Sequence, residues 1–187
     1  MNSTFDSPPK ERIQGLPAHI DQDSVVLILG TLPGRASLDS GRYYADSSNK
    51  FWDILFLACG EKVDKSDGAK GRLLKKYHIA LWDILNSAVR DTSSDKDLFD
   101  EKPNDLPRCL AEHPNIKLLL FHSKDAYKYF KRFFKNPAIP YICVSSPSGQ
   151  NRKSIEEKAK EWKAALSCAI PQLREKSRLT WKSPPHL

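Results

Sequence analysis

Four short apolar runs, none of which alternates with polar residues as an exposed strand does, constrain the fold most. They are residues 25–30 (VVLILG), 79–85 (IALWDIL), 116–121 (IKLLLF) and 139–145 (IPYICVS). Continuous apolar strands are typical of parallel sheets whose two faces are both covered. Segments with helical spacing separate the runs, which predicts helices on both sides of the sheet. We therefore expect an α/β protein, a three-layer α/β/α sandwich around a central, mostly parallel, four-stranded sheet.

The segments between these runs carry helix boundary signals. Helices are expected over residues 47–60, 68–78, 106–112, 123–134 and 154–169. Ser47 or Ser48 suits an N-cap for the first of them, and Gly60 follows its last apolar position. Ser154 and Glu157 have the spacing of a capping box at the start of the last one.

The length of 187 residues is enough for one domain with a full core. We expect a single domain over residues 1–187, with a core at about 24–170 and loosely ordered N- and C-terminal ends. No apolar run approaches the roughly 18 residues that span a bilayer, and residues 1–12 lack a signal-peptide pattern. The expectation is an intracellular protein, cytoplasmic and associated with the nucleoid if the source is a prokaryote.

The formal net charge of +7 favours a polyanionic partner such as nucleic acid, without identifying one. The four cysteines are Cys59, Cys109, Cys143 and Cys168. None lies within four residues of another, so the sequence has no Cys-x-x-Cys clip for a metal and no grouping for an iron–sulfur cluster. We expect buried, reduced thiols and no metal site.

Ligands of parallel sheets bind beyond the carboxyl ends of the strands. This rule places residues 31–49, 83–105, 122–125 and 145–152 around one cleft. The first of these loops contains neither a Gly-x-Gly-x-x-Gly dinucleotide fingerprint nor the Gly-Lys-Ser/Thr of a Walker loop. Its Pro33-Gly34 pair predicts a tight turn, which lets backbone approach a flat ligand or a phosphate.

Taken together, the loops resemble the motifs of the uracil-DNA glycosylase superfamily. They are most similar to the DNA-deoxyinosine (hypoxanthine-DNA) glycosylase family, with the mismatch-specific uracil-DNA glycosylases as cousins. The resemblance runs from about residue 24 to residue 168. It is carried by Gly30, Leu32-Pro33-Gly34, Ser37-Leu38, Tyr43-Tyr44-Ala45, Asn49, Phe51-Trp52, Leu81 to Leu85, Pro103-Asn104-Asp105, Ser145 to Ser148 and Ser154 to Lys158.

This resemblance implies a monofunctional DNA glycosylase of base-excision repair, which flips a deaminated base out of the helix and hydrolyses its bond to deoxyribose. The implied substrate is double-stranded DNA that contains hypoxanthine, with uracil as the second base and single-stranded DNA left open. We expect a monomer that works away from membranes and without a metal or organic cofactor. No lysine stands in a motif as a Schiff-base nucleophile, so lyase activity is not expected.

A flipped base needs a shaped pocket, a stacking ring and hydrogen bonds to its edge. The residues that the resemblance implies for base binding are Leu32, Pro33, Gly34, Tyr44 and His122. Tyr44 resembles the aromatic residue that stacks on the base in the mismatch enzymes. His122 follows the third strand, where related enzymes often carry an Asn that reads the base edge. Simple packing is the alternative role for both side chains.

Asn49 is the expected catalytic residue. Cleavage passes through a cation-like sugar, and negative charge develops on the departing base. The Asn49 amide can hold a water but cannot take its proton, so it would orient the water; capping of the following helix is its alternative role. Leu32 replaces the Asn of the mismatch enzymes. Asp46 and Asp83 are rival carboxylates, although a solvated turn and a structural cap are their simpler roles.

The second motif, VSSPSGQNRKS, resembles the loop that clamps the DNA backbone and fills the gap left by the flipped base. The expected DNA-binding residues are Ser145, Ser146, Pro147, Ser148, Gly149, Gln150, Asn151 and Arg152. Ser145 and Ser148 suit a phosphate, and Arg152 adds sequence-independent charge. Either Gln150 or Asn151 would fill the gap. Ser146 stands near the His of uracil enzymes and the Asn of mismatch enzymes, and as a weaker donor it disfavours uracil activity.

Two other classes stay open at this point. Classical uracil enzymes place an Asp in the first motif, and Leu32 cannot do its job. A DNA-binding relative without catalysis fits the lack of this acid and the serine at position 146. A small-molecule enzyme on the same sheet, such as a nucleotide hydrolase or transferase, is disfavoured because no Gly-rich phosphate loop is present.

Overall fold

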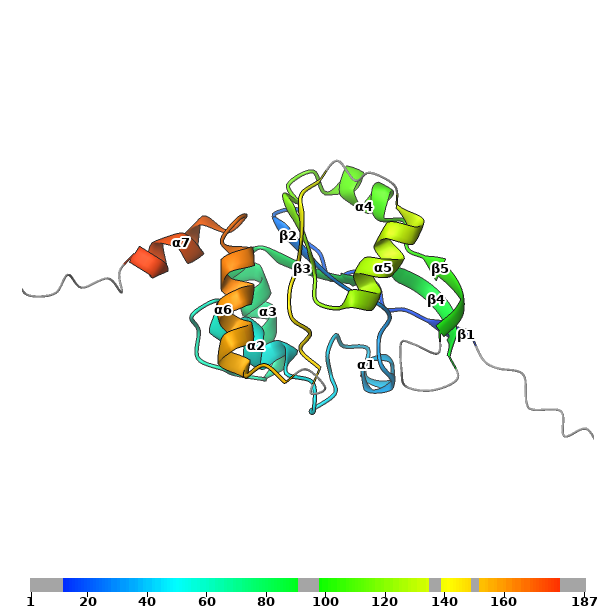
Figure 1. The fold of residues 1–187 in the computed structure, drawn as a ribbon, viewed down its shortest axis with the longest axis horizontal. Coiled ribbons are helices and arrows are strands. Elements are labelled where there is room, and N and C mark those ends of the chain that lie inside the picture. The colour runs from blue at the N-terminus through cyan, green and yellow to red at the C-terminus, as the bar shows by residue number, and fades with distance from the viewer. Residues whose placement is uncertain (1–11, 91–97, 135–138, 149–151, 179–187) are drawn as a thin grey trace, which may run out of the picture.

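The structure, a computed structural model, describes residues 12–90, 98–134, 139–148 and 152–178 (Figure 1). Its main sheet consists of β2 (Val26–Gly30), β3 (Ile79–Asp83), β6 (Leu118–Phe121) and β7 (Tyr141–Cys143). The strand order is β3-β2-β6-β7, and every neighbouring pair is parallel. Gly30 is paired with Asp83, and Phe121 with Cys143, so the carboxyl ends of all four strands meet at one edge. The predicted four-stranded sheet is confirmed.

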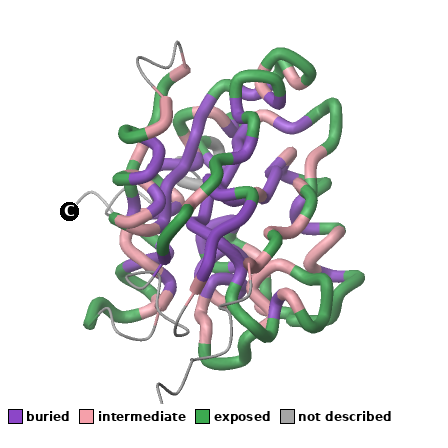
Figure 2. The backbone as a smooth tube through the Cα atoms, turned by 90° about the vertical axis from the view of Figure 1, so that its right-hand side faces the viewer, coloured by how far each residue is buried: buried purple, intermediate pink, exposed green. Residues whose placement is uncertain are grey.

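Helices cover both faces of this sheet. One layer holds α2 (Phe51–Ala58), α3 (Asp67–Tyr77), α6 (Ile155–Leu166) and α7 (Pro171–Arg178), and the other holds α4 (Leu106–Glu112) and α5 (Lys124–Phe133). Val26 and Ile28 of β2 face the first core, whereas Leu27 and Leu29 face the second. Figure 2 shows the resulting buried centre surrounded by exposed turns. The three-layer sandwich is thereby confirmed.

Local signals account for most helix boundaries. Ser123 caps α5 by accepting from the Ala126 N–H at 2.9 Å, and Ser154 and Glu157 form the expected capping box of α6. The expected serine cap of the helix after residue 46 is wrong. The helix begins only at Phe51, whose N–H donates to Asn49 Oδ1 at 2.9 Å. A short helix that the sequence did not indicate, α1 (Arg35–Ser40), follows the Pro33-Gly34 turn.

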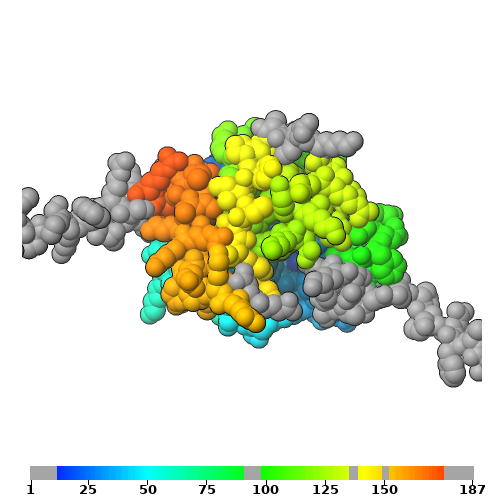
Figure 3. All heavy atoms as spheres, in the orientation of Figure 1, coloured from blue at the N-terminus to red at the C-terminus, as the bar shows by residue number. Residues whose placement is uncertain are grey.

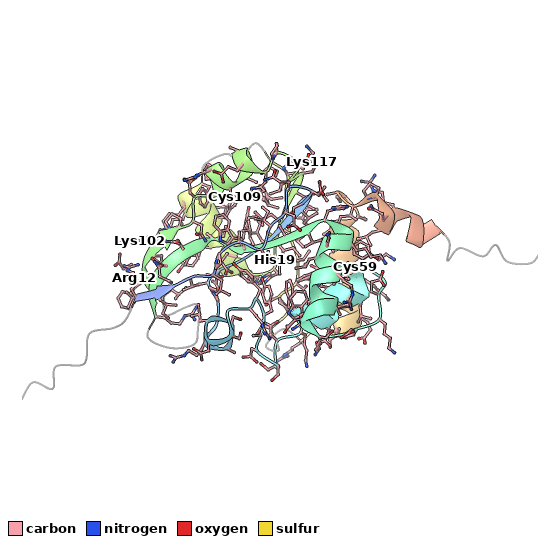
Figure 4. The ribbon with its side chains drawn as sticks, turned by 180° about the vertical axis from the view of Figure 1, so that it is seen from behind. Arg12, His19, Cys59, Lys102, Cys109 and Lys117 are labelled. Carbon is pink, nitrogen blue, oxygen red and sulfur yellow. The ribbon has the colours of Figure 1, made fainter. Side chains whose placement is uncertain are left out.

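A second, three-stranded sheet occupies part of the region that we expected to be a loop. It contains β1 (Arg12–Gln14), β4 (Leu85–Arg90) and β5 (Leu98–Pro103), in the order β1-β4-β5 with antiparallel pairs. Arg12 donates to Ser87 Oγ at 3.1 Å and forms an ion pair with Asp100, which ties the three strands together. Figure 4 shows Arg12 and Lys102 on this sheet, away from the helices around Cys59.

Described elements also lie outside residues 24–170, the range expected for the core. Besides β1, the backbone of His19 forms an antiparallel bridge with Leu81, whose strand lies at the edge of the main sheet (Figure 4). At the other end, α7 places Leu173 in the first core. Residues 12–23 are exposed or only partly buried, and Ile13 and Ile20 pack against the second core. The loose ordering expected for the two ends of the chain stays a prediction. No described helix is long and apolar enough to cross a membrane.

The cysteines do not all lie in the core. Cys59 and Cys109 are buried as expected, but Cys143 and Cys168 are exposed. Cys143 belongs to β7, an edge strand of the main sheet, and Cys168 follows α6. All four thiols are free of disulfides.

Candidate active site

The loops that follow the parallel strands are joined to one another by hydrogen bonds. The Lys50 N–H donates to the Pro147 carbonyl at 3.2 Å, which links the first motif to the second. The Thr31 and Ser123 hydroxyls lie 3.3 Å apart and link the loop after β2 to the start of α5. The predicted gathering of these loops at the carboxyl edge is therefore present in the structure.

Tyr44 and His122 form a direct pair at this edge. The Tyr44 hydroxyl lies 2.6 Å from His122 Nε2, and the Tyr44 ring stacks on Phe51 with centroids 3.5 Å apart and planes 7° apart. Tyr44 has a left-handed backbone with φ of 54°, a conformation that is costly for a residue other than glycine. The hydrogen bond and the stack oppose this cost. They also commit one face of the Tyr44 ring to Phe51.

His122 is a neutral imidazole near pH 7. Burial lowers its pKa to about 4, because the charged form loses its hydration. Its ring stacks on Trp162 with centroids 6.1 Å apart. Nδ1 is buried and has no hydrogen-bond partner among the described residues, while Nε2 contacts the Tyr44 hydroxyl. A neutral ring carries one donor and one acceptor, and with Nε2 engaged by Tyr44 only Nδ1 is left for a further partner.

Gly30, the last residue of β2, makes room for this pair and for an acid. A Cβ at position 30 would collide with the Asp83 carboxylate and lie 3.3 Å from both His122 Nε2 and the Tyr44 hydroxyl. Asp83 is buried with 4% exposure, and its backbone carbonyl accepts from Asn104 Nδ2 at 2.9 Å. We call Gly30, Tyr44, Asp83 and His122 the first-motif site.

Tyr43, the neighbour of Tyr44, serves a different contact. Its hydroxyl donates to the Leu16 and Pro17 carbonyls at 3.2 Å each. Burial raises the pKa of this phenol well above its usual range, and the charge of Asp83 adds to the effect. Tyr43 therefore holds the N-terminal segment against the first motif.

Asn49 lies beside both motifs and is half-buried. Its Oδ1 accepts from the Phe51 N–H at 2.9 Å, and its own N–H donates to the Asp46 carbonyl at 3.1 Å. The side-chain oxygen thus caps the first turn of α2, as the alternative interpretation expects. A carboxamide oxygen has two lone pairs, so this bond leaves capacity for one further donor. The catalytic role of Asn49 stays a prediction.

The two rival carboxylates lie in opposite environments. Asp46 is exposed and accepts from the Ser48 hydroxyl at 2.7 Å and from the Ser48 N–H at 2.8 Å. These bonds lower its pKa, as expected for a solvated turn residue. Asp83 instead belongs to the first-motif site, so it is the rival acid that lies beside Tyr44 and His122.

The Leu32-Pro33-Gly34 turn spans core and surface. Leu32 is buried in the second core with 6% exposure. Pro33 is also buried, and its carbonyl accepts from Arg90 NH1 of β4 at 3.0 Å. Gly34 is exposed at the N-cap of α1, with open space around its Cα. A base-binding role stays a prediction for all three residues.

The second motif lies against α6. We call residues 145–152 the second-motif loop; Gly149, Gln150 and Asn151 lie outside the described residues. Both donors of Ser145 bind Glu161, with the amide at 2.9 Å and the hydroxyl at 2.6 Å. The Ser145 carbonyl accepts from Trp162 Nε1 at 3.0 Å. Ser145, expected to bind a phosphate, therefore makes its contacts inside the protein.

The rest of the described loop is also structured. Ser146 Oγ accepts from the Ser148 N–H at 3.2 Å, and Lys158 of α6 donates to the Ser148 carbonyl at 3.4 Å. Pro147 is buried, and Arg152 is exposed. Neither Lys158, Glu161 nor Trp162 was singled out from the sequence for this contact. Their spacing predicts only a helix, and no nearby sequence signal indicates that residue 161 contacts residue 145.

Two cavities are lined by no residue of the first-motif site. One of about 300 Å³ is lined by Tyr43, Trp52, Lys70 and the segment around His19. Another of about 450 Å³ is lined by Trp82, Asn104, Arg108 and Cys109, among others. The crevice expected between Tyr44 and Asn49 is neither of them. Among the described residues, no three His, Cys, Asp or Glu side chains gather closely enough to hold a metal ion.

Comparison with known proteins identifies the family of this chain. The family model described as Uracil DNA glycosylase superfamily matches residues 17–169. The chain is 33% identical over 155 residues to the Hypoxanthine DNA glycosylase of Methanosarcina barkeri, covering 82% of this chain and 97% of the relative. It is 31% identical over 154 residues to the Hypoxanthine DNA glycosylase of Methanosarcina acetivorans, with the same coverage of 82% and 97%.

A solved structure agrees with these matches. The solution NMR structure of a candidate uracil DNA glycosylase from Methanosarcina acetivorans superposes with a TM-score of 0.74 at 29% identity, covering 85% of this chain and 99% of that chain. Fold, loops and matches together define a DNA glycosylase, an enzyme that hydrolyses the bond between a base and its deoxyribose. The chain belongs to the uracil-DNA glycosylase superfamily, as the resemblance of its motifs implies.

Proposed function

We propose that the protein is a monofunctional glycosylase of base-excision repair that removes hypoxanthine from deoxyinosine in double-stranded DNA, with uracil a weaker substrate. The names of both curated relatives support this base. The structural observation that carries it is the Tyr44–His122 pair beside Gly30. Hypoxanthine presents the acceptors O6 and N7 and an N1–H donor, so a neutral imidazole can bond to it without a charge.

Selection against adenine follows from the same pair. When the Tyr44 hydroxyl donates to His122 Nε2, the imidazole proton lies on Nδ1. An N–H at that atom would donate to the keto oxygen of hypoxanthine but would repel the amino group of adenine. Buried polar groups that are left unpaired cost about 1–3 kcal/mol, which is enough to favour the deaminated base.

For the chemical step, we assign the orientation of the attacking water to Asn49. The lone pair of Oδ1 that does not bind the Phe51 N–H is available to hold it. Asp83 is the rival, because a buried carboxylate beside the base would favour the positive charge that develops on the sugar. Leu32, Pro33 and Gly34 are assigned to the wall of the base pocket.

Contact with the DNA backbone is assigned to the second-motif loop. Ser146, Ser148 and nearby N–H groups would bind phosphate, and Arg152 would add charge. Gln150 or Asn151 would fill the gap in the stack. The protein would work inside the cell as a monomer on duplex DNA, because one chain supplies both motifs.

A cleavage assay tests this function. The protein is incubated with labelled duplexes that carry deoxyinosine, deoxyuridine or only normal bases, and abasic sites are then cut with hot alkali. We expect cutting at deoxyinosine, less at deoxyuridine and none in the normal duplex. Binding without any cut would support a non-catalytic DNA-binding relative, which the capping role of Asn49 favours. Absence of both would refute the proposed substrate.

A further inference from the structure

Glu161 stands out among the residues that no motif explains. Its carboxylate accepts three hydrogen bonds: from the Ser145 N–H at 2.9 Å, from the Ser145 hydroxyl at 2.6 Å and from Lys153 Nζ at 2.8 Å. Burial alone would raise the pKa of this carboxyl, but the bonds from Lys153 and Ser145 lower it. Glu161 is therefore an anion on α6 that lies against the second-motif loop.

An anion at this place opposes DNA on electrostatic grounds. The loop is expected to meet phosphates, and like charges repel across about 8 Å at physiological salt. A backbone N–H, a serine hydroxyl and a lysine ammonium are also the donors that a phosphate would use. The Glu161 carboxylate occupies all three. Its contribution to DNA binding must therefore come from the shape that it gives to the loop.

The contacts of α6 with the loop show what that shape depends on. Lys158, Glu161 and Trp162 lie at positions i, i+3 and i+4 of α6, on one face of the helix. Trp162 binds the Ser145 carbonyl, so the amide, hydroxyl and carbonyl of Ser145 are all held by α6. Figure 3 shows residues 139–148, in yellow, beside the orange atoms of α6. Fixing both ends of Ser145 also fixes the direction in which Ser146 and Pro147 leave β7.

We propose that Glu161 is a positioning residue for DNA binding: by holding Ser145 against α6, it presets Ser145 to Ser148 of the second-motif loop in the conformation that grips the DNA backbone. The proposal rests on the DNA-binding role assigned above to that loop. It makes a prediction opposite in sign to the one from charge alone. Removing the Glu161 charge weakens DNA binding, although the protein becomes more positive.

Binding and chemistry are measured separately. Affinity is measured by fluorescence anisotropy with a duplex that carries a tetrahydrofuran abasic analogue, which the enzyme cannot cleave. Chemistry is measured as the single-turnover rate on a deoxyinosine duplex at saturating protein. For Glu161→Ala we expect the Kd to rise by about tenfold, because two hydrogen bonds that organise the loop are lost. The saturated rate is expected to stay within about threefold of wild type, because Glu161 touches no residue of the first-motif site.

Two further variants separate position from charge. Glu161→Gln keeps an acceptor for the Ser145 N–H and offers an amino group to the Ser145 oxygen, so it is expected to weaken binding by only about threefold. Glu156→Gln, on the exposed side of the same helix, removes the same charge without touching the loop. Its Kd is expected to be equal to or slightly below that of wild type. If Glu161→Ala fails to melt cooperatively, Glu161→Gln compared with Glu156→Gln decides.

The outcomes are exclusive. Weaker binding in both Glu161 variants with Glu156→Gln unaffected supports the positioning role. The positioning role would be overturned if Glu161→Ala binds DNA as tightly as wild type or more tightly. If Glu161→Ala does not fold, the same result in Glu161→Gln would overturn it. Arg152→Ala tests whether the second-motif loop contacts DNA at all. If this variant and the Glu161 variants all leave the Kd unchanged, the DNA-binding role assigned to the loop is refuted. If Arg152→Ala weakens binding and the Glu161 variants do not, only the role of Glu161 fails.

Discussion

His122 at the first-motif site is buried and neutral, whereas Arg152 at the end of the second-motif loop is exposed and positively charged. The first region is held by ring stacking and a partly buried hydrogen bond, and the second by the Glu161 carboxylate and one face of α6. Buried uncharged groups discriminate between bases, and exposed charges bind any DNA. The two regions should therefore fail in different ways when they are altered.

The largest effect is expected at Asn49, which lies where the two regions meet. Asn49→Ala should lower the single-turnover rate on a deoxyinosine duplex by about 10²–10³-fold, because the attacking water loses its orienting group. The rate is measured by alkaline cleavage at saturating protein. Asn86→Ala, on the exposed face of β4, is the control and should keep the wild-type rate. A wild-type rate in Asn49→Ala would leave this residue only its capping bond to Phe51.

The second effect is the pH dependence of stability through His122. Because its pKa falls from the ordinary 6.5 to about 4 in the folded protein, the unfolded chain takes up a proton between these values that the native protein does not. Stability that is present above pH 6.5 is then lost as the pH falls, by up to about 3 kcal/mol at pH 4. Urea unfolding at pH 7 and pH 5 measures it.

His122→Asn provides the matched comparison, because an amide does not titrate in this range. The loss between pH 7 and pH 5 should be smaller in this variant than in wild type. An equal loss in both proteins would show that His122 is not held neutral by its surroundings. The carboxylates then become the source of any acid sensitivity.

The third effect is steric crowding at the first-motif site. Gly30→Ala adds a methyl group where the Asp83 carboxylate lies, and it should destabilise the fold by about 1–3 kcal/mol. The cleavage rate should fall as well, because Tyr44 and His122 must move. Gly71→Ala in α3 meets nothing within 4 Å and should raise stability by up to about 1 kcal/mol. Thermal melting of both variants compares the two sites. A melting temperature of Gly30→Ala equal to that of wild type would refute the crowding at position 30.

The smallest effect is expected at Arg152. Arg152→Ala should raise the Kd for any duplex by about threefold and reduce the slope of log Kd against log salt by about one, because one phosphate contact is lost. Titrations at several salt concentrations measure both. The discrimination between deoxyinosine and normal DNA should not change. A change in discrimination would mean that the second region also reads the base.

The same contrast explains what the sequence could predict. The apolar runs of β2, β3 and β6 are almost entirely buried, so their pattern identified these strands, whereas β7 at the edge of the sheet is exposed or partly buried. The small sheet was missed because most residues of β5 (LFDEKP) are polar and exposed to solvent, and because β1 has only three residues. Tyr44, Asn49 and His122 were singled out because their loops resemble the motifs of the superfamily. Glu161 was not, because its partner Ser145 is 16 residues away on another element.

One missing methyl group at the end of β2 has a consequence for engineering this enzyme. Asp83, His122 and Tyr44 come from three separate stretches of the chain but share the space that Gly30 leaves open. A change in the size of any one of them alters the room for the other two. Attempts to redirect the enzyme to a larger or differently substituted base should therefore vary these three positions as a linked set, with position 30 kept as glycine.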